Sequence, residues 1–160
     1  MREIEFRGFD LDLKKWVYGG YHKHIKRQVA PFGDELKEQD VQHLIVISGF
    51  ADWNMPKPLQ IATNIYKKSI GQYTGLKDKN GVKIFEGDIL KYPDNDEIDC
   101  MGVVEYGHFN CSCCHAVFGF TTINNKGWEI DMLVNDKEET PLYEVIGNIY
   151  ENPEFLEVKI

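Results

Sequence analysis

The segment that most constrains the fold runs from Gly71 to Leu90 and reads GQYTGLKDKNGVKIFEGDIL. Two stretches of strand-forming residues flank Asn80-Gly81, a pair that can adopt the positive φ angles of a tight hairpin turn. Asp78 lies where its carboxylate can accept hydrogen bonds from the turn backbone. Common catalytic motifs do not have this form. The segment therefore predicts a small β-rich module and does not indicate a reaction.

Two further glycines in this segment, Gly75 and Gly87, fit bulge or turn positions where a Cβ atom would clash. The simplest interpretation is a double turn that defines the shape of the module. The functional alternative is a surface for a partner, formed by Tyr73, Thr74, Lys77, Glu86 and Asp88.

The rest of the chain also favours strands, because aromatic and β-branched segments recur about every ten residues between Gly, Asn and Asp. Ile4–Phe9 and Trp16–Ile25 predict a hairpin, and further strands are expected over 44–48, 59–66, 70–73, 89–92, 101–106, 116–122, 128–134 and 143–150. Asp34–Gln42 is the best helical candidate, with Asp34 as its cap. The 160 residues therefore predict a mainly β fold with little helix, as a barrel or sandwich. An N-terminal β-rich region over 1–70 and a second module over 71–160 are expected, or one integrated unit.

Charge is distributed unevenly along the chain, whose formal net charge is −8. Residues 1–30 carry seven Lys/Arg and four Asp/Glu, whereas residues 92–160 carry three lysines and 14 acidic residues. The acidic half is expected to repel nucleic acid and to suit a basic partner surface. The competing interpretation is a solvated acidic face that maintains solubility.

The basic N-terminal hairpin supports an alternative function, because lysines interleaved with aromatic rings can hold a nucleic-acid backbone. The residues concerned are Lys14, Lys15, Lys23, Lys26 and Arg27, with Trp16, Tyr18 and Tyr21 among them. Strand residues alternating with exposed lysines would explain the same pattern more simply. The sequence shows no secretion signal and no apolar run near the ~20 residues that span a bilayer, so a cytoplasmic protein without membrane contact is expected.

Three segments resemble the signatures of one protein family. They are Gly71–Leu90, the run YEVIGNIYENPEF over Tyr143–Phe155, and the opening REIEFRGFDLDLKKWVYG over Arg2–Gly19. Together they are similar to the YopX-like family, which is found in phages and prophages. The resemblance implies a β-rich fold with an SH3-like barrel in the C-terminal half and a tendency to self-associate. It brings neither catalytic residues nor an established activity.

Potential metal ligands are concentrated over Cys100–His115, CMGVVEYGHFNCSCCH. The candidate zinc ligands are Cys100, His108, Cys111 and Cys114, with Cys113 and His115 as alternatives. The pair at 111 and 114 has the CxxC spacing of half a zinc site, but the sequence has no second pair. The competing interpretation is a loop or strand edge whose cysteines stay reduced in the cytoplasm, so no cofactor is expected.

Catalytic motifs such as HExxH, GxSxG and the phosphate-binding glycine loop are absent from the sequence. The histidines are scattered, although His22 and His24 would share one face of a strand. We therefore expect a phage or prophage accessory protein that is not an enzyme, a binding or assembly module that forms homo-oligomers and binds a host or phage protein. The aromatic strands Trp16–Tyr21 and Phe118–Phe120 are the expected contact faces. The alternative is a nucleic-acid-binding accessory factor that uses the basic N-terminal hairpin.

Overall fold

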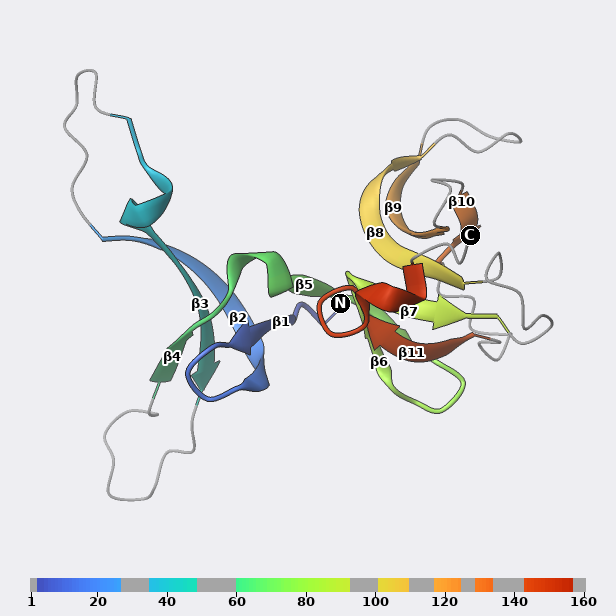
Figure 1. Cartoon of the computed structure of the whole chain (residues 1–160), viewed down its shortest axis with the longest axis horizontal. Coiled ribbons are helices and arrows are strands. Elements are labelled where there is room, and N and C mark those ends of the chain that lie inside the picture. Colours follow the sequence, from blue (N-terminus) through green and yellow to red (C-terminus); the bar gives the residue numbers. More distant parts are fainter. Residues whose placement is uncertain are drawn as a thin grey trace. The chain divides into compact units, whose positions relative to one another are not determined.

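The computed structural model describes residues 3–26, 35–48, 60–92, 101–109, 117–124, 129–133 and 143–156 (Figure 1). Two compact units are present, one over Ile4–Gly71 and the other over Gln72–Ile160 together with the first three residues. Both units are built on antiparallel strands. Within the described ranges no helix is long and apolar enough to cross a membrane.

The unit over Ile4–Gly71 contains four antiparallel strands in the order β4-β3-β2-β1 (Figure 1). They are β1 (Phe6–Asp10), β2 (Lys15–Ile25), β3 (Val41–Ser48) and β4 (Gln60–Asn64). In the turn between β1 and β2, Asp10 Oδ1 accepts the backbone N–H groups of Asp12 and Leu13 at 2.8 and 2.9 Å. The hairpin predicted from the first 25 residues is therefore confirmed.

One face of this sheet forms the core of the unit. Val17, Ile45 and Ile65 are buried, and partly buried apolar side chains pack against them: Phe6, Tyr21, Ile47 and Ile70. Gly8 pairs with Val17 across β1 and β2 and lies against the side chain of Ile65. The close approach of Ile65 to the sheet therefore depends on the absence of a side chain at position 8.

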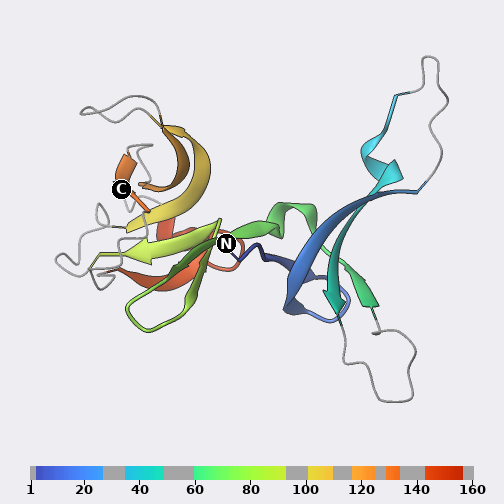
Figure 2. The same cartoon turned by 180° about the vertical axis from the view of Figure 1, so that it is seen from behind.

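The unit over Gln72–Ile160 contains a hairpin and a five-stranded antiparallel sheet. The hairpin pairs β5 (Gly71–Lys77) with β6 (Lys83–Phe85). The sheet has the order β10-β9-β8-β7-β11, with β7 (Asp88–Lys91), β8 (Met101–Phe109), β9 (Val117–Ile123), β10 (Glu129–Met132) and β11 (Glu144–Asn148). β8 and β9 curve strongly together, and Figure 2 shows the same curvature from behind. The buried core consists of Ile84, Leu90, Val104, Phe120 and Leu133.

The mainly β class predicted from the sequence is confirmed. The SH3-like barrel implied by the family resemblance stays a prediction, because the five-stranded sheet is open among the described strands. The described helices are short 3-10 helices: η1 (Glu38–Asp40), η2 (Lys67–Ser69) and η4 (Pro153–Leu156).

The helix predicted over Asp34–Gln42 is wrong. Only η1 lies in the described part of that segment, and β3 begins at Val41. Val41 pairs with Ile25 of β2, so the β-branched run that follows η1 joins a sheet in which such side chains pack well. Tertiary pairing therefore overrides the weak helical pattern of the preceding polar residues.

The loop of the central hairpin is longer than the Asn80-Gly81 pair predicts. Lys77 pairs with Lys83, so the loop spans residues 78–82. Gly81 has a positive φ of 81°, whereas Asn80 is not among the described residues with positive φ. Gly75 has a φ of 92° and lies within a register shift of β5, which confirms its predicted bulge position.

Candidate binding surfaces

Three of the five residues of the predicted partner surface are buried. The five are Tyr73, Thr74, Lys77, Glu86 and Asp88, and Tyr73, Thr74 and Asp88 are 4%, 6% and 1% exposed. Thr74 Oγ1 donates to the Ile84 carbonyl at 2.9 Å, and Asp88 Oδ2 accepts the Phe85 N–H at 2.7 Å. These polar groups therefore stabilise the β5–β6 hairpin and the turn that follows it. Of the five side chains, only Lys77 is exposed, and Glu86 is half-buried.

Glu86 has a perturbed carboxyl group. Burial raises its pKa, the charge of Glu105 raises it further, and hydrogen bonds from the backbone of Gln72 and Tyr106 oppose the shift only in part. The folded state therefore favours the protonated form, so this group costs stability as the pH rises above its unfolded pKa.

Replacing Glu86 by glutamine, which is neutral at every pH, is expected to stabilise the protein relative to the wild type at about pH 7 more than at about pH 4. Urea unfolding of both proteins at the two pH values measures the difference. Glu35→Gln is the control, because it makes the same substitution at an exposed side chain of the other unit. An equal effect of Glu86→Gln at both pH values would contradict the assigned shift.

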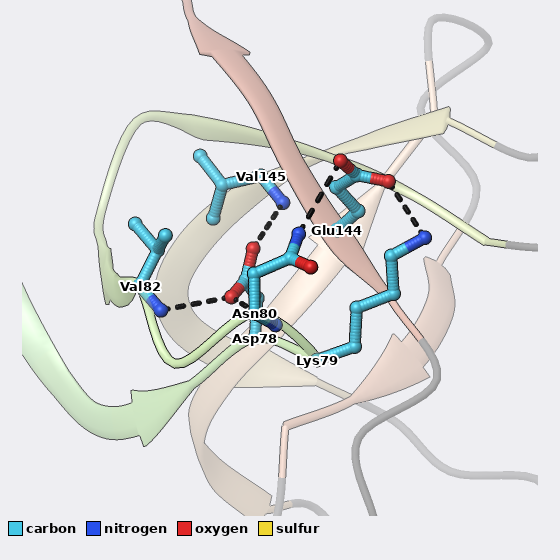
Figure 3. Close-up of polar contacts among 6 residues, drawn as sticks. All are labelled: Asp78, Lys79, Asn80, Val82, Glu144 and Val145. Atoms are coloured by element: carbon cyan, nitrogen blue, oxygen red, sulfur yellow. Dashed lines mark hydrogen bonds and ion pairs between the residues drawn. The ribbon is translucent and has the colours of Figure 1, made fainter.

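The loop of the central hairpin is fixed by one buried carboxylate, that of Asp78 (Figure 3). Its Oδ1 accepts the N–H groups of Asn80 and Val82 at 2.8 and 2.9 Å, and its Oδ2 accepts the N–H of Val145 on β11 at 3.1 Å. Burial alone would raise the pKa of Asp78, but these hydrogen bonds hold it below its usual value. The loop is therefore attached to β11 by its own side chain, as its sequence suggested in part.

Exposed charges surround this attachment. Lys79 Nζ lies 2.7 Å from Glu144 Oε2, and Asn80 Nδ2 donates to Glu144 Oε1 at 3.3 Å (Figure 3). An exposed ion pair of this kind contributes little to stability. The geometry of the loop thus depends on Asp78, and the hydrogen bonds of this carboxylate indicate a structural role for the central segment.

A depression in the unit over Ile4–Gly71 gathers lysines from separate parts of the chain. It consists of two adjoining hollows of about 360 and about 230 Å³, which share Glu38, Val41, His43 and Lys67. Lys23 and Lys37 line the larger hollow, and Lys26 lines the smaller one. We call this region the lysine depression. Lys67 is the first residue of η2, and Ser69 is the last. The Ser69 hydroxyl accepts the N–H of Phe9 on β1 at 2.7 Å, which attaches η2 to β1.

Neither Glu38 nor His43 removes much of, or adds much to, the positive charge that the lysines give this depression. Glu38 Oε1 lies 2.7 Å from Lys67 Nζ, but both side chains are exposed and the pair is screened by solvent. His43 is hydrogen-bonded through Nδ1 to the Tyr21 hydroxyl at 2.7 Å. Burial lowers the pKa of His43, as do the charges of Lys67 and Lys23, so its imidazole is neutral near neutral pH.

The sequence predicted part of this region. Lys23 and Lys26 of the predicted basic hairpin do line the depression, whereas Lys14 and Lys15 lie at the turn between β1 and β2, and Arg27 lies outside the described residues. No sequence pattern pointed to Lys37, His43 and Lys67, because strand pairing and η2 bring them to the site. His22 and His24 share one strand face as predicted, with ring centroids 6.2 Å apart.

A second candidate surface lies on β8 and β9. The sheet face that contributes buried core side chains also carries exposed side chains toward the far ends of these strands. The register pairs Val104 with Thr122, Tyr106 with Phe120, and His108 with Phe118, so these six side chains share one face. Val104 and Phe120 are buried, but Tyr106 is 53% exposed and Phe118 is 71% exposed. The rings of His108 and Phe118 meet edge-to-face with centroids 5.0 Å apart. We call Tyr106, His108 and Phe118 the aromatic face.

The two predicted contact faces differ in exposure. In Phe118–Phe120 the first ring is exposed and the last is 4% exposed, so only Phe118 can meet a partner. In Trp16–Tyr21, Tyr18 is 46% exposed, whereas the Trp16 ring lies 4.8 Å from the Arg7 guanidinium.

The candidate zinc site falls mostly outside the described residues. Cys100, Cys111 and Cys114 are not described, and neither are the alternatives Cys113 and His115. His108 belongs to the aromatic face. In the described ranges, no group of three or more His, Cys, Asp or Glu residues is placed to hold a metal ion.

The chain is similar to known proteins over nearly its whole length. The model of the family described as YopX protein matches residues 5–157. The crystal structure of protein EF1440 from Enterococcus faecalis is 23% identical, with a TM-score of 0.44, and the match covers 98% of this chain and 100% of that one. No curated protein sequence matches significantly. Because the family model spans nearly all residues that form the two units, the chain belongs to the YopX protein family.

Proposed function

We propose that this YopX family member is a phage or prophage accessory protein of the cytoplasm, a non-enzymatic binding or assembly module that self-associates. The observation that carries the proposal is the aromatic face, where Tyr106 and Phe118 are 53% and 71% exposed on the same sheet face as the buried Val104 and Phe120. Exposed apolar clusters next to polar surroundings are typical of protein interaction sites. Host or phage proteins remain further partners in this proposal.

Covering the aromatic face favours association. Burial of one large apolar side chain contributes about 1.5–3 kcal/mol, and aromatic pairs add to this when their rings meet edge-to-face. A second copy is the partner that we favour, because soluble homo-oligomers most often use the same patch on both subunits. Two copies related in this way would bring Phe118 of each against the aromatic face of the other.

Replacing Tyr106 and Phe118 together by serine is expected to turn the self-associating protein into a monomer, because the exposed rings no longer gain from being covered. Sedimentation velocity of the full chain at about 1 M salt measures the mass while screening charge contacts. Both side chains are exposed, so the variant should keep the far-ultraviolet circular dichroism of the wild type.

The matched control replaces Leu13 and Ile61 by serine. These side chains are 61% and 47% exposed and lie in the unit over Ile4–Gly71, so the loss of exposed apolar surface is comparable. The control should associate like the wild type. If the variant at 106 and 118 associates like the wild type, the aromatic face is not the interface.

A nucleic-acid-binding accessory factor is the second candidate function. The observation that favours it is the lysine depression, because lysine side chains are phosphate contacts in proteins that bind a nucleic-acid backbone. Binding to short duplexes or single strands that weakens steeply with salt would support this function. The net charge of −8 opposes it.

A further inference from the structure

The two units carry opposite net charges. Residues of the unit over Ile4–Gly71 include ten Lys/Arg and eight Asp/Glu, a net charge of +2. The rest of the chain has eight Lys/Arg and 18 Asp/Glu, a net charge of −10. Each copy of the protein therefore presents a strongly acidic unit together with a weakly basic one.

The positive charge of the basic unit is concentrated at the lysine depression. Among the described residues, its lining includes Lys23, Lys26, Lys37 and Lys67 but a single carboxylate, that of Glu38. Lysine ammonium groups are compact charges on flexible stems, so they suit several carboxylates in varied positions better than one planar group. Apolar side chains among them, such as Val41 and Ile65, provide a partly apolar floor for a protein segment.

We infer that the lysine depression is an interaction site for carboxylate-rich protein surface, and that its occupant is the acidic unit of a second copy of this chain. This inference rests on the self-association proposed above and adds a second contact to it. Charge complementarity selects the occupant, because the net charge of −10 resides in the same molecule that carries the depression.

A nucleic acid fits these observations less well. A nucleic acid is a polyanion along its whole length, whereas a second copy carries its acidic unit together with a basic one. The contact joins unlike surfaces, so it is head-to-tail and can add copies beyond the dimer formed by the aromatic face.

The test is the mass of the full chain in sedimentation velocity at about 0.1 M and about 1 M salt, where the Debye length falls from about 10 to about 3 Å. The wild type is expected to form species larger than a dimer at low salt and to return to a dimer at high salt. Lys23→Glu combined with Lys26→Glu is expected to weaken the low-salt association by about tenfold and leave the dimer. Lys23→Ala with Lys26→Ala should give a smaller loss in the same direction.

The matched control is Lys14→Glu combined with Lys15→Glu. It makes the same change in net charge on exposed side chains of the same unit, at the turn between β1 and β2 and outside the depression. The control should keep the low-salt association. Equal losses in the two double variants would show an effect of net charge alone and overturn the inference.

Three other results would also overturn it. A wild type that is a dimer at both salt concentrations removes the head-to-tail contact but leaves the proposed self-association intact. A wild type that is a monomer at both removes the proposed self-association as well. A labelled oligothymidine that binds the wild type but not the Lys23/Lys26 variant, while both associate equally, would assign the depression to nucleic acid instead.

Discussion

Replacing Asp78 by alanine is expected to lower the free energy of unfolding by about 3 kcal/mol, because three backbone N–H groups lose their charged acceptor. The side chain is 4% exposed, so water cannot readily replace the carboxylate. The loss should appear in urea unfolding monitored by circular dichroism. Hydrogen exchange at the Val145 amide should also accelerate, because this bond attaches the loop to β11.

Two companion variants make this prediction specific. Asp78→Asn keeps one carbonyl oxygen for the loop but places an amide group near one of the N–H donors, so its loss should be intermediate. Asn80→Ala removes the exposed 3.3 Å hydrogen bond to Glu144 and a side-chain hydrogen bond to Asp78, but it leaves the three backbone hydrogen bonds of Asp78 in place, so its loss should be well below that of Asp78→Ala. A loss below about 1 kcal/mol for Asp78→Ala would show that the carboxylate does not hold the loop.

The same carboxylate gives the protein an acid sensitivity. Hydrogen bonds to the charged form lower the pKa of Asp78 in the folded state, so its stabilisation is complete above the unfolded pKa and is lost as the pH falls through the folded one. The difference in stability between wild type and Asp78→Asn should therefore shrink in acid.

Replacing Gly8 by alanine is expected to destabilise the unit over Ile4–Gly71 by about 2 kcal/mol through overpacking. The new Cβ would lie 3.0 Å from both Cβ and Cγ2 of Ile65 and closer still to its Cδ1, so the strand or the core must shift. Thermal and urea unfolding measure the loss. In the control Gly20→Ala, the nearest atom to the new Cβ is the Val46 carbonyl oxygen at 3.9 Å, and little change is expected.

A double-mutant cycle with Ile65→Val tests the physical cause. Valine lacks the Cδ1 atom that comes closest to position 8, so Gly8→Ala should cost less in the valine background. Strictly additive losses would mean that the destabilisation has a different origin from the contact with Ile65.

The strand pattern could be predicted from the sequence because alternating apolar residues and turn residues mark strands locally. The central segment also indicated its own turn chemistry, and Asp78 does accept hydrogen bonds from that turn. Burial could not be predicted in the same way. Tyr73, Thr74 and Asp88 are polar or amphipathic residues beside a turn, but folding buries all three. Thr74 and Asp88 hydrogen-bond to backbone groups, and the Tyr73 ring packs against Phe85. The partner surface that the sequence offers as the alternative to a shape-defining double turn therefore does not form from these three side chains.

The lysine depression shows a second limit of the sequence. Lys23 and Lys26 are close in the chain, but Lys37 and Lys67 join them only because β2 pairs with β3 and η2 lies on the same unit. Such a site has no local signature. The aromatic face was partly predictable, since Phe118 was expected at a contact, but its pairing with Tyr106 and His108 depends on the register of β8 and β9.

The most direct test of self-association is sedimentation equilibrium of the wild-type full chain over a wide range of concentration at about 1 M salt, where charge contacts are screened. The exposed rings of the aromatic face predict a reversible rise in mass from one copy to two as concentration increases. A mass of one copy at every concentration would contradict the account that this protein is a self-associating module.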